Sequence, residues 1–312
     1  MKARATINSL GQVAAMKRVF IAGATGYLGR FLCAEFQQRG WYVIALVRNS
    51  AQAKPIAADQ LIEAQATDAA SITGVMAGTD LVVSSLGITR QIDGLDYWDV
   101  DYRANLNLMR EAERASVGRF AYIHVLRAEE MAHVPMVAAK SAFVEELQRA
   151  AIASTIIAPT GYFSDMSDFL TMAQSGRVWL FGDGSKRINP IHGADLATAT
   201  VEAIEDGVPW LDVGGPDIFD QKELAELAFT CLDKPSRVTF LPDMLRGIAL
   251  QLLPRVTPRC ISGPARFFLS ALALDMVGER HGTRHLRDHF EQSLATTRSA
   301  SIHKLRTARK KS

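Results

Sequence analysis

The chain has 312 residues, of which 48% are apolar and 22% are charged, and its formal net charge at pH 7 is +2. This balance excludes collagen-like, disordered and disulfide-scaffold proteins, and the length suits two domains or one large α/β domain with an appendage. The three cysteines (Cys33, Cys231 and Cys260) lie far apart and lack metal-ligand spacing. We therefore expect reduced thiols and a cytoplasmic location.

The two ends of the chain differ from its middle in composition. Residues 1–16 lack the sustained apolar run of a signal peptide, and we expect a disordered extension there. Residues 294–312 contain six basic residues and no acidic one, which predicts a basic, disordered tail, with contact to anionic lipid or nucleic acid as the alternative. The tail alone does not indicate a nucleic-acid-binding protein, so no nucleic acid is expected as a partner. No stretch approaches the ~18 apolar residues that cross a bilayer.

Short aliphatic and β-branched runs alternate with helical patterns in the first half of the chain. The expected strands are residues 18–22, 42–46, 61–64, 81–84, 120–124 and 154–158, and the expected helices are residues 27–39, 69–76, 97–115 and 138–150. This alternation predicts right-handed βαβ crossovers. The strands are continuously apolar, as strands buried on both faces of a parallel sheet should be. We therefore expect an α/β fold with a Rossmann-type, doubly wound parallel sheet.

Beyond Pro159 the pattern changes to shorter elements punctuated by glycine and proline. The expected elements are a strand at 177–181, a strand or turn at 212–215, and helices at 195–205, 221–232 (with Asp220 as its N-cap), 244–253, 264–277 and 285–293. We expect residues 17–160 to form the Rossmann core. Residues 161–293 should form a small, mostly helical C-terminal lobe for a substrate, partly interleaved with the core and laid over the carboxyl edge of the sheet.

A glycine-rich turn, Gly23-Ala-Thr-Gly26-Tyr-Leu-Gly29, lies between the first expected strand and the first expected helix. Glycines there let the backbone approach a pyrophosphate, and the helix N-terminus offers unpaired N–H groups. This context predicts dinucleotide binding, and the alternative is a turn that binds nothing. The residues expected to contact the dinucleotide here are Gly23, Thr25, Gly26, Tyr27, Leu28, Gly29 and Arg30.

The end of the second expected strand indicates which dinucleotide is bound. Sites selective for NAD usually place an acidic residue there to accept a hydrogen bond from the ribose 2′-hydroxyl. This chain instead has Val47, Arg48 and Asn49. Arg48 would pair with a 2′-phosphate and Arg30 could add a second contact, which favours NADP(H) over NAD(H). Arg48 could also be an exposed strand end, and Asp68 could either meet the adenine or cap a local turn.

Further motifs resemble the short-chain dehydrogenase/reductase superfamily in its extended and atypical branches. Besides the glycine turn, they are Val83-Ser-Ser-Leu-Gly87, Val100-Asp-Tyr-Arg-Ala-Asn105, Ala158-Pro-Thr-Gly161-Tyr-Phe and Asn189-Pro-Ile-His192-Gly-Ala-Asp195. The chain is most similar to NmrA-like and isoflavone-reductase-like members, and more distantly similar to divinyl chlorophyllide reductases and the NAD(P)-binding accessory subunit of respiratory complex I. The resemblance covers residues 17–220 and implies that Leu86, Gly87, Lys140 and Pro159 also contact the cofactor.

The same resemblance implies a catalytic tyrosine, a lysine four residues later and a serine after the fifth strand. Lys140 is present, but Met136 stands at the tyrosine position and His124 stands where the serine is expected. Methionine cannot transfer a proton, which argues against the tyrosine-dependent mechanism. Lys140 could act alone as the acid/base with a pKa lowered toward neutral, as in isoflavone-reductase-like enzymes. It could also only hold the cofactor ribose, or lie on the helix surface.

Three weaker catalytic candidates accompany Lys140. His124 could polarise the substrate or be a structural group at a strand end. Asn105 matches an asparagine that the resemblance implies supports the lysine through water. Tyr162 could line the nicotinamide site or supply a proton. His281, His285 and His289 have the spacing of one helical face, but no carboxylate or cysteine cluster completes a site, so no metal is expected.

Two functions remain open on these residues. The first is an NADP(H)-dependent reductase of a small, largely apolar substrate, with Lys140 replacing the missing tyrosine. The second is a non-catalytic NADP(H) sensor or assembly factor of the NmrA-like kind. The apolar segments 244–253 and 266–277, together with the basic tail, could make peripheral contact with a membrane or pack against the core. The oligomeric state is left open.

Overall fold

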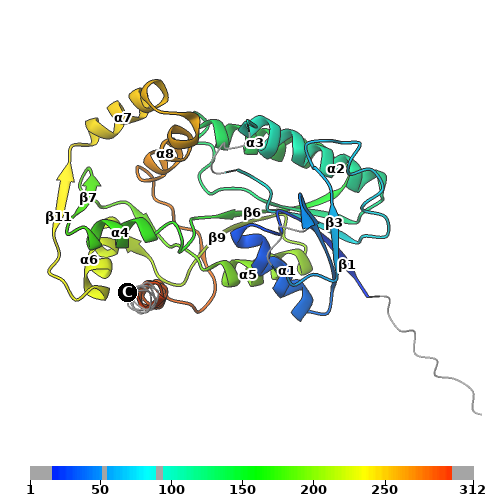
Figure 1. Cartoon of the computed structure of the whole chain (residues 1–312), viewed down its shortest axis with the longest axis horizontal. Helices are drawn as coiled ribbons and strands as arrows, with labels where there is room; N and C mark the ends of the chain where they lie inside the picture. Colours follow the sequence, from blue (N-terminus) through cyan, green and yellow to red (C-terminus); the bar gives the residue numbers. More distant parts are fainter. Residues whose placement is uncertain (1–15, 51–54, 89–93, 297–312) are drawn as a thin grey trace, which may run out of the picture.

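The computed structural model describes residues 16–50, 55–88 and 94–296 (Figure 1). Eight strands form the central sheet, in the spatial order β12 (Glu279–Arg280), β9 (Trp210–Gly214), β6 (Ala153–Pro159), β5 (Arg119–Ile123), β4 (Leu81–Ser84), β1 (Arg18–Ala22), β2 (Tyr42–Val47) and β3 (Gln60–Glu63). All neighbouring pairs are parallel. The strand order reverses between β1 and β4, which makes this the switch point where such sheets bind ligands. The predicted Rossmann-type fold is confirmed.

Helices cover both faces of this sheet (Figure 1). One face carries α1 (Tyr27–Gln38) and α5 (Gly193–Glu205), and the other carries α2 (Asn105–Arg114) and α3 (Pro135–Arg149). Successive residues of β1 point to opposite faces of the sheet. Val19 packs against the face covered by α1, and Phe20 packs against the face covered by α2. Both are fully buried. This explains why the strands are apolar throughout their length.

The lobe formed after β6 lies at the opposite end of the molecule from β3 (Figure 1). Its elements are α4 (Ser167–Gln174), β7 (Val178–Phe181), β8 (Arg187–Ile188), β10 (Phe219–Asp220), α6 (Gln221–Cys231), β11 (Val238–Leu241), α7 (Asp243–Val256), α8 (Arg259–Ala271) and a helix at 286–296. β7 pairs with β11 and β8 pairs with β10, so neither pair joins the central sheet. The predicted N-cap is confirmed, because Asp220 and Glu223 form a reciprocal capping box at α6.

Three predicted helices differ most from those observed, whereas the others differ by at most three residues at an end. Residues 69–76 form turns, because Gly74 adopts a left-handed conformation at φ +84° that ends any helix there. The single helix predicted at 97–115 is a π-helix, η2 (Trp98–Ala104), followed by α2. The helix predicted at 264–277 is α8, which begins five residues earlier and ends at Ala271.

The predicted terminal segments lie largely outside the described residues. Residues 1–15 and 297–312 are among those not described, whereas residues 294–296 continue the last helix and Leu294 is buried. The prediction of a basic, disordered tail stays untested, since residues 297–312 lie outside the described residues. Within the described ranges, no helix is both long and apolar enough to cross a membrane.

Candidate functional site

The glycine turn joins β1 to α1 at the carboxyl edge of the sheet. Gly23 has φ +82°, a left-handed conformation that favours glycine. A Cβ atom on Gly29 would lie 2.1 Å from the Gly23 carbonyl oxygen, so only glycine lets α1 approach the turn this closely. Gly26 occupies the N-cap position and has no side chain with which to cap the helix. The first N–H groups of α1 and the positive end of its dipole can therefore face an anion.

Two cavities meet at this turn. The first, of about 400 Å³, extends along the ends of β2 and β3, and Arg48 lines it. The second, of about 410 Å³, extends past Lys140 and beneath the lobe. Both are lined by Gly26, Ser85, Gly87 and Ile88, so they form one groove around the turn. A dinucleotide bent around the turn would place one nucleotide half in each cavity.

Most residues predicted to bind the cofactor line this groove. Those on the first cavity are Gly23, Thr25, Gly26, Arg48, Leu86 and Gly87, and those on the second are Gly26, Tyr27, Leu28, Gly29, Gly87, Lys140 and Pro159. Two predicted residues are not part of either lining. The guanidinium of Arg30 donates hydrogen bonds to the carbonyl oxygens of Thr25 (3.2 Å) and Pro55 (3.0 Å). Asp68 accepts a hydrogen bond from the Ala70 N–H (3.0 Å). Of the two roles considered for Asp68, this contact is the capping of a local turn.

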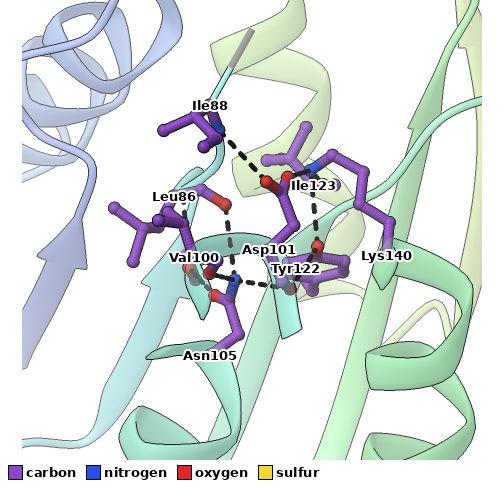
Figure 2. Close-up of polar contacts among 9 residues, drawn as sticks. Leu86, Ile88, Val100, Asp101, Asn105, Tyr122, Ile123 and Lys140 are labelled. Atoms are coloured by element: carbon purple, nitrogen blue, oxygen red, sulfur yellow. Dashed lines mark hydrogen bonds and ion pairs between the residues drawn. The ribbon is translucent and has the colours of Figure 1, made fainter. Parts of the chain in front are cut away.

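Lys140 belongs to a buried polar network at the junction of the cavities (Figure 2). Its Nζ atom lies 3.2 Å from Oδ1 of Asp101 and donates hydrogen bonds to the Tyr122 hydroxyl (3.3 Å) and the Ile123 carbonyl (3.3 Å). Burial by itself would lower the pKa of Lys140, but its interactions with Tyr122 and Asp101 outweigh burial and raise the pKa above its ordinary value. The pairing with Asp101 therefore opposes the fall of this pKa toward neutral that one of the alternatives for Lys140 requires.

Asp101 is the anionic partner in this network and comes from η2. It has no exposed surface, and its Oδ2 atom accepts a hydrogen bond from the Ile88 N–H (3.2 Å). Burial raises the pKa of Asp101, although Lys140 and the Ile88 N–H act in the opposite direction. A Cβ atom on Gly87 would lie 2.6 Å from Oδ1 of Asp101. The glycine therefore lets the loop after β4 pass close to the ion pair.

Asn105 supports the network through the backbone of η2 (Figure 2). Its Nδ2 atom donates to the carbonyl oxygens of Val100 (3.1 Å) and Asp101 (3.0 Å), and its Oδ1 atom accepts from the Ser84 hydroxyl (2.5 Å). These bonds join η2 to the end of β4. Asn105 thus acts on Lys140 by fixing the residue that pairs with it.

His124 follows β5 and lines the second cavity. Burial, with a smaller contribution from the charge of Lys140, lowers the pKa of His124 to about 3, so the imidazole is neutral. Its ring lies edge-to-face with Trp210, with centroids 5.8 Å apart. Among the described residues, no group bonds to its buried Nδ1 atom. His124 can therefore polarise a ligand only as a neutral group.

Tyr162 and Asp165 follow β6 and line the second cavity. Burial raises the pKa of Tyr162, and its ring lies edge-to-face with Tyr27 at 5.5 Å between centroids. The Tyr162 N–H donates to Oδ2 of Asp165 (3.1 Å). Burial raises the pKa of Asp165 to about 6 despite this hydrogen bond. A carboxyl group with that pKa can exchange a proton near neutral pH, which makes Asp165 a candidate the sequence analysis missed.

The remaining wall of the second cavity is largely apolar. It is supplied by α4, α8 and the segment after α8, through Met166, Phe169, Phe267, Phe268, Ala271, Leu272, Leu274 and Met276. Met136, at the position where the resemblance implies a tyrosine, also lines it. Exposed Lys186 and Arg187 contribute to its edge. The cavity thus suits an apolar ligand with a polar end.

The three histidines with helical spacing do not share one face. His281 and His285 precede the helix at 286–296, and only His289 lies on it. His285 contacts Asp217, with Nδ1 2.7 Å from Oδ2. In the described ranges no group of three or more His, Cys, Asp or Glu side chains is arranged to hold a metal ion.

A family model described as NAD(P)H-binding matches residues 23–207, more than half of the chain. The chain belongs to this NAD(P)H-binding family. The matched region begins at the glycine turn and contains η2, α3 and Asp165. The resemblance to NAD(P)-binding proteins that the sequence predicts is therefore confirmed.

Proteins similar to this chain carry different names. Subunit 9 of the mitochondrial NADH dehydrogenase 1 alpha subcomplex from Arabidopsis thaliana is 26% identical over 71% of this chain and 60% of the relative. A chloroplastic divinyl chlorophyllide a 8-vinyl-reductase from Zea mays is 25% identical over 75% of this chain and 64% of the relative. This chain therefore spans less than two thirds of either relative.

Solved structures show the same fold. The NADPH complex of a quinone oxidoreductase from Escherichia coli superposes with a TM-score of 0.70 at 18% identity, over 88% of this chain and 99% of that chain.

The groove fits an NAD(P)H cofactor. The N–H groups of α1 would hold its phosphates, Arg48 lies on the side of one nucleotide half, and Lys140 and Pro159 lie on the side of the other.

Proposed function

We propose that this protein is an NADP(H)-dependent reductase of an apolar substrate. The observation that carries the proposal is the continuity of the groove, which leads from the glycine turn directly into an apolar cavity lined by both Lys140 and Asp165. A cofactor on one side and a substrate on the other would meet at this junction.

The proposed chemistry uses different residues for cofactor and proton. When bound, the reduced dinucleotide supplies a hydride to a substrate carbon. Asp165 gives the accompanying proton and is reprotonated from solvent, since its pKa of about 6 suits this task. Lys140 stays a cation, because Asp101 pairs with it, and it orients the cofactor ribose rather than acting as the acid. The apolar walls, such as Phe267, bind the substrate and exclude water.

The preference for NADP(H) rests on Arg48. Among the described residues that line the first cavity, Arg48 carries the only charge, and none is acidic. A guanidinium there suits a 2′-phosphate, whereas no carboxylate is present to accept from a 2′-hydroxyl.

Titration with NADPH and NADH, followed by nicotinamide fluorescence, tests this proposal. We expect NADPH to bind at least about tenfold more tightly than NADH, because a charged hydrogen bond contributes roughly 1.5–3 kcal/mol. Arg48→Ala should abolish the preference, while Arg149→Ala, an exposed arginine on α3 outside both cavities, should retain it. Absence of binding to either dinucleotide would overturn the reductase proposal.

A second candidate function is an NADP(H) sensor or assembly factor without turnover. Two features favour it. Met136 lines the cavity where the resemblance implies a proton-transferring tyrosine, and the Lys140 cation is paired with Asp101. One relative is named as a subunit of a larger enzyme. NADPH oxidation with a quinone or an activated vinyl compound separates the two functions, since similar proteins are named for these acceptors. Turnover supports the reductase, and tight binding without turnover on either acceptor class supports the sensor.

A further inference from the structure

We infer that the exposed face of α7 and the start of α8 docks on an anionic lipid bilayer. This α7 face consists of Met244, Leu245, Ile248, Leu252, Val256 and Ile261, whose side chains are exposed. The inference does not depend on the proposed reductase activity.

The apolar residues of α7 form a stripe along the helix. Met244, Ile248, Leu252 and Val256 follow one another at intervals of four residues, which places them on one slowly turning face. They are 70%, 41%, 50% and 72% exposed, and no residue of α7 is buried. A helix of a globular core would turn this stripe inward. Here it faces solvent.

Exposed apolar side chains are concentrated in this part of the molecule. Of the thirteen large apolar side chains exposed in the described ranges, seven lie between Phe240 and Ile261. Figure 1 shows α7 at the outer end of the lobe, away from the central sheet. Scattered exposed apolar residues are ordinary, but a contiguous cluster marks an interaction surface.

Internal contacts hold the α7 face in a fixed orientation. Arg246 pairs with Asp243 on the same helix, with Nε 2.7 Å from Oδ1, and donates to the Leu269 carbonyl oxygen of α8 (3.1 Å). The polar contacts of Arg246 thus hold α7 against α8, and the apolar stripe of α7 faces outward.

The charge around the stripe identifies the kind of partner. Residues 243–259 contain a single acid, Asp243, and it is already paired with Arg246. Arg255 and Arg259 are exposed beside the apolar residues. Exposed apolar side chains flanked by cations match an anionic bilayer surface. A second copy of this chain fits less well, because a face-to-face dimer would bring the same arginines together.

Docking in this orientation would bring the substrate cavity close to the membrane. α8 begins at the docked face, and its later residues Phe267 and Phe268 line the cavity. An apolar substrate dissolved in the bilayer would then have a short path to the cavity. This consequence, unlike the docking itself, rests on the proposed function.

Vesicle cosedimentation of the full chain tests the inference. Vesicles of phosphatidylglycerol and phosphatidylcholine should bind the protein at physiological salt, and vesicles of phosphatidylcholine alone should bind it several-fold more weakly. Replacing two stripe residues, Ile248→Glu with Leu252→Glu, should weaken binding by about tenfold or more. The matched control is Leu61→Glu on β3, which is 44% exposed and lies at the far edge of the sheet, and it should bind as the unaltered protein does.

Three results would overturn the inference. One is the absence of binding to anionic vesicles, and another is unchanged binding of the double variant, which would assign the contact to the basic tail. The third is a concentration-dependent dimer that the double variant abolishes, which would identify the α7 face as an interface between copies. The thermal unfolding midpoint of each variant shows whether it is folded, independently of any nucleotide binding.

Discussion

The Nζ atom of Lys140 lies 3.2 Å from Oδ1 of Asp101, and the two residues belong to α3 and η2, which are 39 positions apart in the chain. Asp101 is fully buried, and the Lys140 side chain is only 13% exposed. A pair enclosed in this way costs desolvation energy, and each charge depends on the other for compensation. The pair also places a permanent cation at the junction of the two cavities. Removing one partner should therefore affect both stability and cofactor binding.

Asp101→Asn should lower the free energy of unfolding by about 3 kcal/mol at pH 7, because it leaves the Lys140 charge buried without an anion. Without Asp101, burial dominates and the pKa of Lys140 should fall. Urea unfolding measures the change in stability. Lys140→Met combined with Asp101→Asn removes both charges and should recover most of the loss. Lys140→Met alone completes the comparison. If the double variant loses as much stability as Asp101→Asn and Lys140→Met lose in sum, the ion pair is not the cause of the destabilisation.

Gly29→Ala should abolish NADPH binding, because its Cβ atom would lie 2.1 Å from the Gly23 carbonyl oxygen and would displace α1 from the glycine turn. The forced movement should also cost about 1–3 kcal/mol of stability. Gly247→Ala on α7 is the matched control, since a Cβ atom there meets no atom within 4 Å apart from its chain neighbours and the backbone of its own helix. Fluorescence titration of both variants checks the prediction. Equal NADPH affinity in the two would show that the turn does not hold the cofactor.

Much of the fold could be predicted because local sequence determines it. β1 and β4 begin and end at the predicted residues, since each is a short apolar run bounded by polar or glycine residues. The N-cap Asp220 could be predicted because a capping residue directly precedes the helix that it caps, although its reciprocal bond with Glu223 was not predicted. The helix predicted at 69–76 was wrong because the prediction relied on the spacing of apolar residues. It did not take account of Gly74, whose left-handed conformation prevents a helix there.

The chemistry of the site was less accessible to sequence reasoning. The glycine turn was recognised from adjacent residues, but the pairing of Asp101 with Lys140 joins distant segments and depends on η2. Asp165 is an ordinary loop aspartate in sequence, and its raised pKa arises from burial in the folded chain, to which the charge of Asp168 adds. The one available signal was a carboxylate inside an apolar run, in Tyr162-Phe-Ser-Asp165-Met. Burial of this kind is a property of the tertiary structure.

Asp165 should make stability depend on pH. Its pKa is raised from 3.8 to about 6, so the folded protein binds this proton more strongly than the unfolded chain does. The contribution of Asp165 is then present in full below about pH 4 and is lost as the pH rises through about 6. Asp165→Asn removes the ionisation, so the variant should unfold at a higher temperature than the unaltered protein at pH 8 and show less difference at pH 5. Equal differences at both pH values would contradict the raised pKa.

Asp165 should also shape the pH dependence of reduction. Only the protonated carboxyl can give a proton, so kcat/KM with a quinone or vinyl acceptor should fall as the pH rises through about 6. Asp165→Asn should lower kcat by about 10²–10⁴-fold and remove this dependence, while the Kd for NADPH stays unchanged. Asp206→Asn, an exposed aspartate at the C-terminal end of α5 that lines neither cavity, should keep both the rate and the profile. If the profile survives in Asp165→Asn, another group supplies the proton, and Tyr162 and Lys140 are the next to replace because both line the same cavity.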